Sequence, residues 1–313
     1  MPETYEPRQE RATTLPDEPY YQLPTAPRRR GRTFVGGILL ALGVVWLLGI
    51  LLGGANWREG PIGAGNILFN QTYLADRLEM DVSTGDIEIR PWDGSDIKVE
   101  AIYHGGSPAD YAVTIEPREG TLYVSGGPKA GFLSFGQRDI EYRISMPAGG
   151  DAQIRTMNGD IDVAELQGVV DLNSTNGDIT ATAIGNGLRA ETINGGIELN
   201  EISGSLDLHS INGEISLSDG QVSSGTVKNT NGDIDLWGVS GALTVETVNG
   251  DVVVRLPEDS SFTLDATTIS GEIDSDFELQ DGRETRSTLA GTTGSGGPRL
   301  EIETISGDIS ITH

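Results

Sequence analysis

The sequence lacks several features on which common classes of protein depend. Its 313 residues include no cysteine, which excludes disulfide frameworks, thiolate metal sites and cysteine nucleophiles. Aromatic residues make up only 6% of the chain, whereas glycine occurs 43 times without a collagen-like period. That much glycine predicts many turns, and no stretch after residue 53 has the pattern of a good amphipathic helix. We therefore expect strands and turns.

Positive charge is also scarce. The chain has 21 basic and 47 acidic residues, for a formal charge of −26. Residues 1–33 hold five acidic and six basic side chains, so the remainder carries −27. A field of this sign repels phosphates and anionic lipid headgroups. Nucleic acid is thus not expected as a partner, whereas cations, basic polymers and basic protein surfaces remain compatible.

The N-terminal 53 residues divide into a polar segment and an apolar segment. Residues 1–33 begin with a proline-rich stretch that has no sustained period, and we expect a disordered tail. An alternative is a docking peptide around Tyr20 and Tyr21. Residues 34–52 carry no charge, and at ~1.5 Å per residue they would span a ~30 Å hydrocarbon layer.

Arginines decide the expected orientation of this segment. Arg28, Arg29, Arg30 and Arg32 precede the apolar run, which predicts a cytoplasmic N-terminus. We therefore expect a single-pass protein of the cell membrane, with a transmembrane helix at 34–53 in the bilayer, a linker at 54–66 and an extracellular domain at 67–313. A cleavable signal peptide is the alternative, although its apolar run would be shorter, nearer the start and followed by Ala-x-Ala.

One short phrase recurs nine times and organises the rest of the chain. Its usual form is an Asn-Gly pair, an acidic residue and an aliphatic residue. The copies lie at 83–87, 157–161, 175–179, 193–197, 211–215, 230–234, 248–252, 269–273 and 305–309. From Gly159 onward the glycines are separated by 18, 18, 18, 19, 18, 21 and 36 residues. So steady a period predicts stacked structural units.

Each period reads as two short strands and two turns. In residues 192–209 the pair Asn194-Gly195 favours a tight turn, after which Ile197 and Leu199 alternate with Glu198. Matching positions of successive periods are aliphatic, which predicts inward columns in a parallel β-solenoid of ~18-residue coils, paired at ~4.8 Å. Antiparallel hairpins in a sandwich or barrel are the alternative. In the 36-residue interval before Gly307, we expect a coil to continue with an irregular loop at 280–297.

Three polar columns accompany the turns. The asparagines are predicted to stack as an amide ladder, and the threonines and serines two residues earlier to bond turn backbone groups. The asparagines are Asn158, Asn176, Asn194, Asn212, Asn231 and Asn249, and the hydroxyl column is Thr156, Ser174, Thr192, Ser210, Thr247, Thr268 and Thr304. The acidic column is Asp160, Asp178, Glu214, Asp233, Asp251, Glu272 and Asp308, interrupted by Gly196. It is either a solvated charged turn or a weak divalent-cation site.

The domain resembles the DUF4097 family of "putative adhesins", close to the head-GIN adhesin domains. The resemblance is carried by the opening at 82–94, the Met146-Pro147-Ala148-Gly149 step, the Asn-Gly-Asp-Ile phrases and the ending at 294–309. It implies a membrane-tethered β-solenoid with no established catalytic residues. The chain also looks like the anchored DUF4097 proteins of lia-type envelope-stress operons, in part through its glycine-rich segment at 36–52.

The residues do not point to catalysis. His104, His209 and His313 are scattered without a serine–acid neighbour or a metal-ligand spacing, and the Gly185-Asn186-Gly187 segment lacks the helix of a dinucleotide site. We therefore expect no enzyme activity, no cofactor and no catalytic or metal residue. The expected function is a putative adhesin or envelope scaffold that contacts an unknown envelope protein or glycan. An accessory of an envelope-stress response and a glycan-active enzyme are the alternatives.

Overall fold

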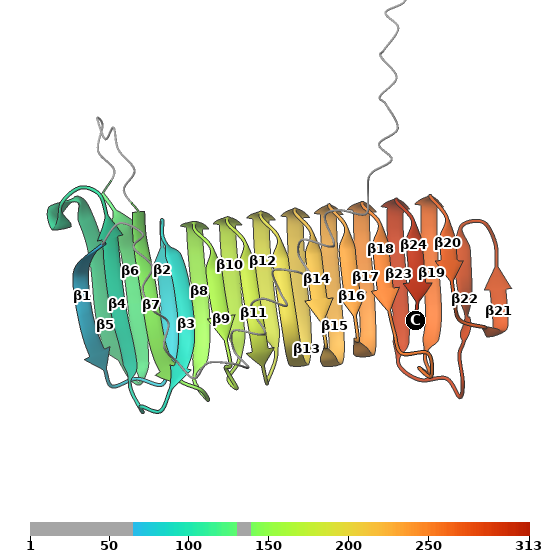
Figure 1. Cartoon of the computed structure of the whole chain (residues 1–313), viewed down its shortest axis with the longest axis horizontal. Helices are drawn as coiled ribbons and strands as arrows, with labels where there is room; N and C mark the ends of the chain where they lie inside the picture. Colours follow the sequence, from blue (N-terminus) through green and yellow to red (C-terminus); the bar gives the residue numbers. More distant parts are fainter. Residues whose placement is uncertain (1–64, 130–138) are drawn as a thin grey trace, which may run out of the picture. The chain divides into compact units, whose positions relative to one another are not determined.

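The computed structural model describes residues 65–129 and 139–313, and these residues form an all-β domain (Figure 1). Their only helical element is a 3₁₀ turn, η1, at Pro108–Asp110. The all-β class predicted from the sequence is confirmed. The predicted tail at 1–33, the predicted transmembrane helix at 34–53 and the linker up to residue 64 lie outside the described residues. Within 65–129 and 139–313, no helix has the length and apolarity needed to span a membrane.

Two sheets enclose the core, and β13 contributes to both of them. The B sheet has the spatial order β5 (Tyr111–Arg118), β6 (Thr121–Pro128), β2 (Arg77–Val82), β8 (Asp151–Asn158), β10 (Val170–Asn176), β12 (Leu188–Asn194), β13 (Ile197–Asn212), β15 (Gln221–Asn231), β17 (Ser240–Asn249), β23 (Arg299–Ser306), β19 (Thr263–Ser270), β22 (Thr288–Thr292) and β21 (Gln280–Glu284). The A sheet has the order β1 (Asn66–Tyr73), β4 (Ile97–His104), β7 (Asp139–Pro147), β3 (Asp86–Trp92), β9 (Ile161–Ala164), β11 (Ile179–Ile184), β13, β14 (Ile215–Ser218), β16 (Ile234–Trp237), β18 (Val252–Arg255), β24 (Ile309–Thr312) and β20 (Ile273–Ser275).

The central coils stack in parallel and in register. Val170 pairs with Leu188 and Leu188 with Leu206 in the B sheet, whereas Ile179 pairs with Ile197 in the A sheet. The aliphatic residues at these positions are at most 4% exposed and form one core cluster between the sheets. Alternation of apolar and polar side chains therefore places one face of every strand in the core and the other in water. The predicted solenoid is confirmed, and the hairpin alternative is wrong for these coils.

Spatial order departs from chain order at both ends of the domain. The coil of β2 and β3 lies between the coil of β6 and β7 and the coil of β8 and β9. The last coil of the chain, β23 and β24, lies between β17–β18 and β19–β20. Antiparallel strands finish the ends, with β1, β4 and β5 at one end and β21 and β22 at the other.

The predicted coil with an irregular loop at 280–297 is therefore wrong. Strands β21 and β22 form an antiparallel hairpin there, and β22 pairs with β19. The physical reason is that β19 already has its parallel neighbour on one side, namely β23. Its other edge would be open without a covering strand, and the hairpin provides one. The spacing in the sequence could not reveal this hairpin, because an interval of 36 residues fits two stacked coils as well as one coil and a hairpin.

The buried hydroxyl of Tyr142 leads to a prediction about the stability of the domain. Tyr142 is fully buried, its Oη has no hydrogen-bond partner among the described residues, and burial raises its pKa. We expect Tyr142→Phe to raise the free energy of unfolding by about 1 kcal/mol, because it removes an unsatisfied polar group. Urea unfolding checks this. Tyr111→Phe is the control with the opposite sign, since Tyr111 Oη donates to the carbonyl of Gly105 at 2.9 Å. A loss of stability in Tyr142→Phe would contradict the prediction.

Candidate functional site

The asparagines at the turn between the two sheets form the predicted amide ladder. Asn176 Nδ2 donates to Asn158 Oδ1 at 3.0 Å, and Asn194 Nδ2 donates to Asn176 Oδ1 at 2.8 Å. The same bond repeats through Asn212, Asn231 and Asn249 at 3.1, 3.0 and 3.0 Å. Each amide thus uses its donor and acceptor on its neighbours, so the column is a structural device.

The hydroxyl column also has the predicted role. Ser174 Oγ donates to the carbonyl of Gly159 at 3.1 Å and Thr192 Oγ1 to that of Gly177 at 3.1 Å, and Ser210, Thr268 and Thr304 make equivalent bonds. Thr156 and Thr247 are the exceptions, because their buried hydroxyls have no partner among the described residues. Asn229 is a member of this column that the sequence pattern missed. Its Nδ2 donates to Gly213 at 2.7 Å, so an amide replaces the hydroxyl there.

The acidic column binds backbone amides. Asp160 Oδ1 accepts from the backbone N–H of Asp178 at 2.8 Å, and Asp178 Oδ1 accepts from that of Gly196 at 2.7 Å. The same bond joins Asp233 to Asp251, Asp251 to Asp308, and Asp308 to Glu272, each at 2.9 Å. Within the described part of the chain, no three His, Asp or Glu side chains are grouped to hold a metal ion. Weak divalent-cation binding at this column stays a prediction.

Glu214 lies where this row of bonds is interrupted, and it gives a pH prediction. Partial burial raises its pKa, and the neighbouring Asp233, Asp235 and Glu198 raise it further. The folded state therefore gains stability from protonated Glu214 below the ordinary glutamate pKa of 4.5, and this gain is lost as pH rises through the raised pKa. We expect Glu214→Gln to be more stable than wild type near neutral pH and equal to it in acid. Urea unfolding across this range checks it, and a gap that widens in acid would contradict it.

Gly196 causes the interruption, because it has no side chain that could accept from the next coil. A Cβ there would lie 3.3 Å from the carbonyl oxygen of Glu214, so a small side chain fits after a slight adjustment. We expect Gly196→Asn to stabilise the domain by about 1 kcal/mol, through one added hydrogen bond and a less flexible unfolded chain. Gly196→Ala separates the two effects, since it changes only the unfolded chain. Equal unfolding free energies for the two variants would show that the bond does not form.

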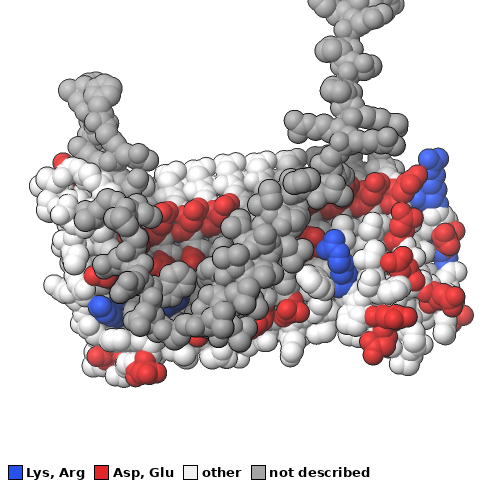
Figure 2. All heavy atoms as spheres, viewed as in Figure 1, with Lys and Arg blue, Asp and Glu red and all other residues white. Residues whose placement is uncertain are grey.

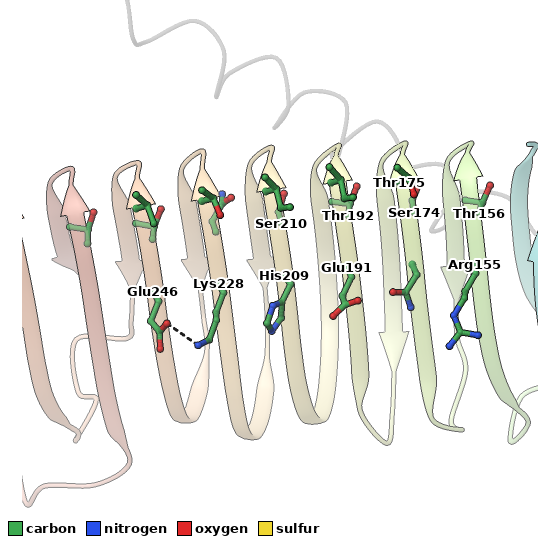
Figure 3. Close-up of a pocket in the computed structure, with 18 of the residues that line it drawn as sticks. Arg155, Thr156, Ser174, Thr175, Glu191, Thr192, His209, Ser210, Lys228 and Glu246 are labelled. Carbon is green, nitrogen blue, oxygen red and sulfur yellow. Dashed lines mark ion pairs between the residues drawn. The ribbon is translucent and has the colours of Figure 1, made fainter. Parts of the chain in front are cut away.

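A groove crosses the outer face of the B sheet. It has a volume of ≈ 930 Å³ and extends from β2 to β19 (Figure 3). Two columns of outward side chains line it, one charged and one largely aliphatic. The charged column, in spatial order, is Asp81, Arg155, Asn173, Glu191, His209, Lys228, Glu246, Glu303 and Thr267. The aliphatic column is Met157, Thr175, Ile193, Ile211, Thr230, Val248, Ile305 and Ile269.

The two columns differ in how they meet solvent. In the aliphatic column, Met157 is 58% exposed, Ile305 47% and Ile211 44%, so an apolar row lies in water. The charged column is partly neutralised within the chain, because Lys228 Nζ lies 2.8 Å from Glu246 Oε2. Figure 3 shows Arg155, Glu191, His209 and Lys228 in one line across the strands. A long face that combines apolar and charged rows can bind an extended or flat partner.

The three histidines do not come together in a reactive site. His209 lies in the groove, 3.0 Å from Asp207, whereas His104 is 3.7 Å from Glu141 and His313 packs against the ring of Phe277. The Gly185-Asn186-Gly187 segment follows β11 and leads into β12, and the amide of Asn186 donates to the carbonyl of Gln167. The charged surface is dominated by carboxylates, as the face drawn in Figure 2 shows. The groove is thus the feature best suited to a partner.

A family comparison identifies the domain on which this groove lies. The family described as Toastrack DUF4097 matches residues 75–312, which is most of the chain. The chain belongs to the DUF4097 family. The match begins just before β2 and ends in β24, so the DUF4097 domain includes the whole stack of parallel coils. None of the curated proteins matches the chain.

Three solved structures from bacteria are among those similar to this DUF4097 chain. A protein titled "putative adhesin" from Parabacteroides distasonis is 14% identical, with a TM-score of 0.41, over 80% of this chain and 98% of its own. A second "putative adhesin", from Bacteroides fragilis, is 11% identical with a TM-score of 0.39, over 78% of this chain and 96% of its own. A "putative cell adhesion protein" from Clostridium sporogenes is 14% identical with a TM-score of 0.28, covering 78% and 98%.

Sequence reasoning explained the turn of the DUF4097 repeat and missed its groove. The signal was present in the first residue of each phrase, which is Ile, Val, Met or Thr from residue 157 onward. Those residues were expected only as part of the turn motif. In the structure they lie on the outer face of the B sheet, directly before the asparagines. An aliphatic residue repeated at an outward position produces a contiguous exposed apolar row, a feature that is typical of interaction surfaces.

Proposed function

We propose that this DUF4097 protein is a membrane-anchored adhesin or envelope scaffold, which displays its solenoid outside the cell and binds another envelope component along the B sheet. The observation that carries the proposal is the groove of ≈ 930 Å³ with its exposed aliphatic column. The apolar run at 34–52 and the arginines before it support the anchor in the bilayer and the cytoplasmic N-terminus. The partner would be an envelope protein or a glycan, and the activity would be non-catalytic.

Binding and topology are tested separately. Whole cells that carry the chain should lose binding to envelope material when Ile193 and Ile211 are both changed to Asp. Trp237→Ser is the matched control, because Trp237 is 55% exposed on the A sheet. Equal loss in both variants would remove the groove from the proposal. For topology, protease added to intact cells should cleave the domain and spare a tag placed before residue 1. Cleavage of that tag would overturn the orientation.

The second candidate function is an accessory or sensory role in an envelope-stress response. Its support is the resemblance of segment 36–52 to membrane segments of lia-type systems. Residues 1–33 are too few for a folded output domain, so a cytoplasmic partner would have to receive the signal. Deletion of 1–33 should then abolish transcriptional output and leave surface binding intact. Unchanged output in that deletion would exclude this role. Turnover of a glycan panel would instead favour an enzyme.

A further inference from the structure

The aliphatic column of the groove is an apolar row that no described element covers. Its members lie on eight adjacent strands, so at ~4.8 Å per strand the row is about 34 Å long. From the charged column to the asparagines at the turn edge is three residues, or about 10 Å, so this face has a projected area of about 340 Å². Two such faces would together bury about 700 Å², which is the size of a weak, reversible interface.

We propose that this face of the B sheet binds the same face of a second copy of the chain. The two copies are related by a twofold axis that runs parallel to the strands. Such an axis reverses the order of the coils and keeps the position along each strand. The aliphatic column therefore meets the aliphatic column, and the charged column meets the charged column in reverse order. The proposal goes beyond the proposed function, because pairing needs no other envelope component.

Charges in the charged column fit this reversed order. With the axis at His209, Arg155 faces Glu303 of the second copy and Glu191 faces Lys228, and each contact occurs twice. Within its own chain Glu191 also pairs with Arg189 and Lys228 with Glu246, so the contacts between copies would extend these ion pairs. Asn173 then faces Glu246, and Asp81 faces Thr267, so no like charges meet in the column. Each register follows from the strand pairing, which aligns His209 with Glu191 on one side and Lys228 on the other.

Other arrangements fit less well. Moving the axis by half a strand toward β15 places Glu191 against Glu246 and His209 against Lys228. Moving the axis by half a strand spacing toward β12 leaves one pair of permanently charged residues of opposite sign, Arg155 and Glu246. A twofold axis that runs across the strands, along the stack of coils, keeps the order of the coils and reverses the position along each strand. Each charged residue would then face either the same residue of the second copy or the aliphatic column. The pattern of charges thus selects the antiparallel pair centred on His209.

Two repulsive terms act against the pair, and both are limited. In the next outward column Asp207 faces Asp207 and Glu79 faces Asp265 of the second copy, but Asp207 is bound to Arg189 at 2.8 Å and Asp265 to Arg299 at 2.9 Å within its own chain. The charge of −27 after residue 33 repels the second copy at long range. At physiological ionic strength the Debye length is about 8 Å, so most of that repulsion is screened.

The absence of cysteine allows a direct test in the full chain. His209→Cys places a single thiol at the proposed axis, and Thr180→Cys places one on the outer face of the A sheet. In detergent-solubilised full-length protein at physiological salt, a short bismaleimide should link His209→Cys into dimers and leave Thr180→Cys at background. Equal linking of both variants, or of neither, would overturn the proposal.

A charge exchange then tests the register. In the His209→Cys background, Glu191→Lys should lower the yield of dimer about tenfold, because the introduced ammonium group would face Lys228 of the second copy. Adding Lys228→Glu should restore the yield. Glu198→Lys on the A sheet is the control for the change in net charge, and thermal unfolding confirms that each variant is folded. A yield that Glu191→Lys leaves unchanged, or that the double exchange fails to restore, would overturn this pairing. Binding to envelope material is measured separately, so failure here leaves the proposed function standing.

Discussion

Removal of residues 299–313, the coil of β23 and β24, is expected to unfold residues 263–292. In an ordinary repeat array the final unit is an end unit, and its loss shortens the stack. Here β23 and β24 lie between two other coils and pair with both. Leu300, Ile302, Ile309 and Ile311 are at most 4% exposed, and their burial contributes roughly 6–12 kcal/mol. That is comparable with the whole stability of a typical domain, about 5–15 kcal/mol.

Hydrogen exchange measured by mass spectrometry checks this result. Peptides from β19 and β22 should lose their protection in the deletion variant, whereas those from β10 and β12 should keep it. The control replaces residues 281–284 of the outermost strand β21, all of which are exposed, with glycine and serine. That change should leave β19 protected. Retained protection of β19 after the deletion would mean that it closes directly onto β17, and the prediction would be wrong.

Gly213→Ala is expected to lower the free energy of unfolding by about 3 kcal/mol. A Cβ at this position would lie 1.9 Å from the carbonyl oxygen of Gly195 and 2.5 Å from its carbonyl carbon. These atoms belong to the backbone of the neighbouring coil, so no side chain can move aside. Gly195 is itself held there, because its N–H donates to the carbonyl of Asn212 at 3.1 Å. The effect is steric, since the φ of Gly213 is outside the left-handed region.

Gly149→Ala is the matched control for this substitution. A Cβ on Gly149 meets nothing within 4 Å, and its φ is also outside the left-handed region. We expect a change within about 0.5 kcal/mol, with a small gain from the less flexible unfolded chain. Denaturant unfolding of both variants measures the difference. A loss below about 1 kcal/mol in Gly213→Ala would show that the coils can separate at the turn, against the close packing seen in the structure.

The repeat made the coil predictable, and its interruptions made the ends unpredictable. Residues such as Ile197 and Leu199 alternate with polar neighbours at a fixed period, so their burial follows from elementary strand geometry. The same logic predicted the ladder of Asn176 and its neighbours. The hydrogen bonds that backbone amides donate to the acidic column could not be predicted, because a carboxylate after a turn glycine is equally compatible with free hydration.

The order of the coils could not be read from the sequence for a different reason. Leu300 matches Leu243 in pattern, but it matches Leu264 as well, and all three occupy one column in the structure. The sequence pattern identifies which positions of the repeat stack on one another, but it does not show which repeats are neighbours in space. The groove could not be predicted because a single exposed aliphatic residue such as Ile193 is common on protein surfaces, and only the strand pairing shows that it belongs to a row.

The position of the last coil also sets the order in which this domain can be made. Domains generally fold as the chain emerges from the N-terminus during synthesis, and β19 and β20 are made before β23 and β24. Until residues 299–313 leave the ribosome, strands β19 and β20 lack the parallel neighbours β23 and β24. The coil of β23 and β24 is therefore inserted between two coils that are made before it, and a chain that stops before residue 299 would leave an edge of β17, β18, β19 and β20 unpaired.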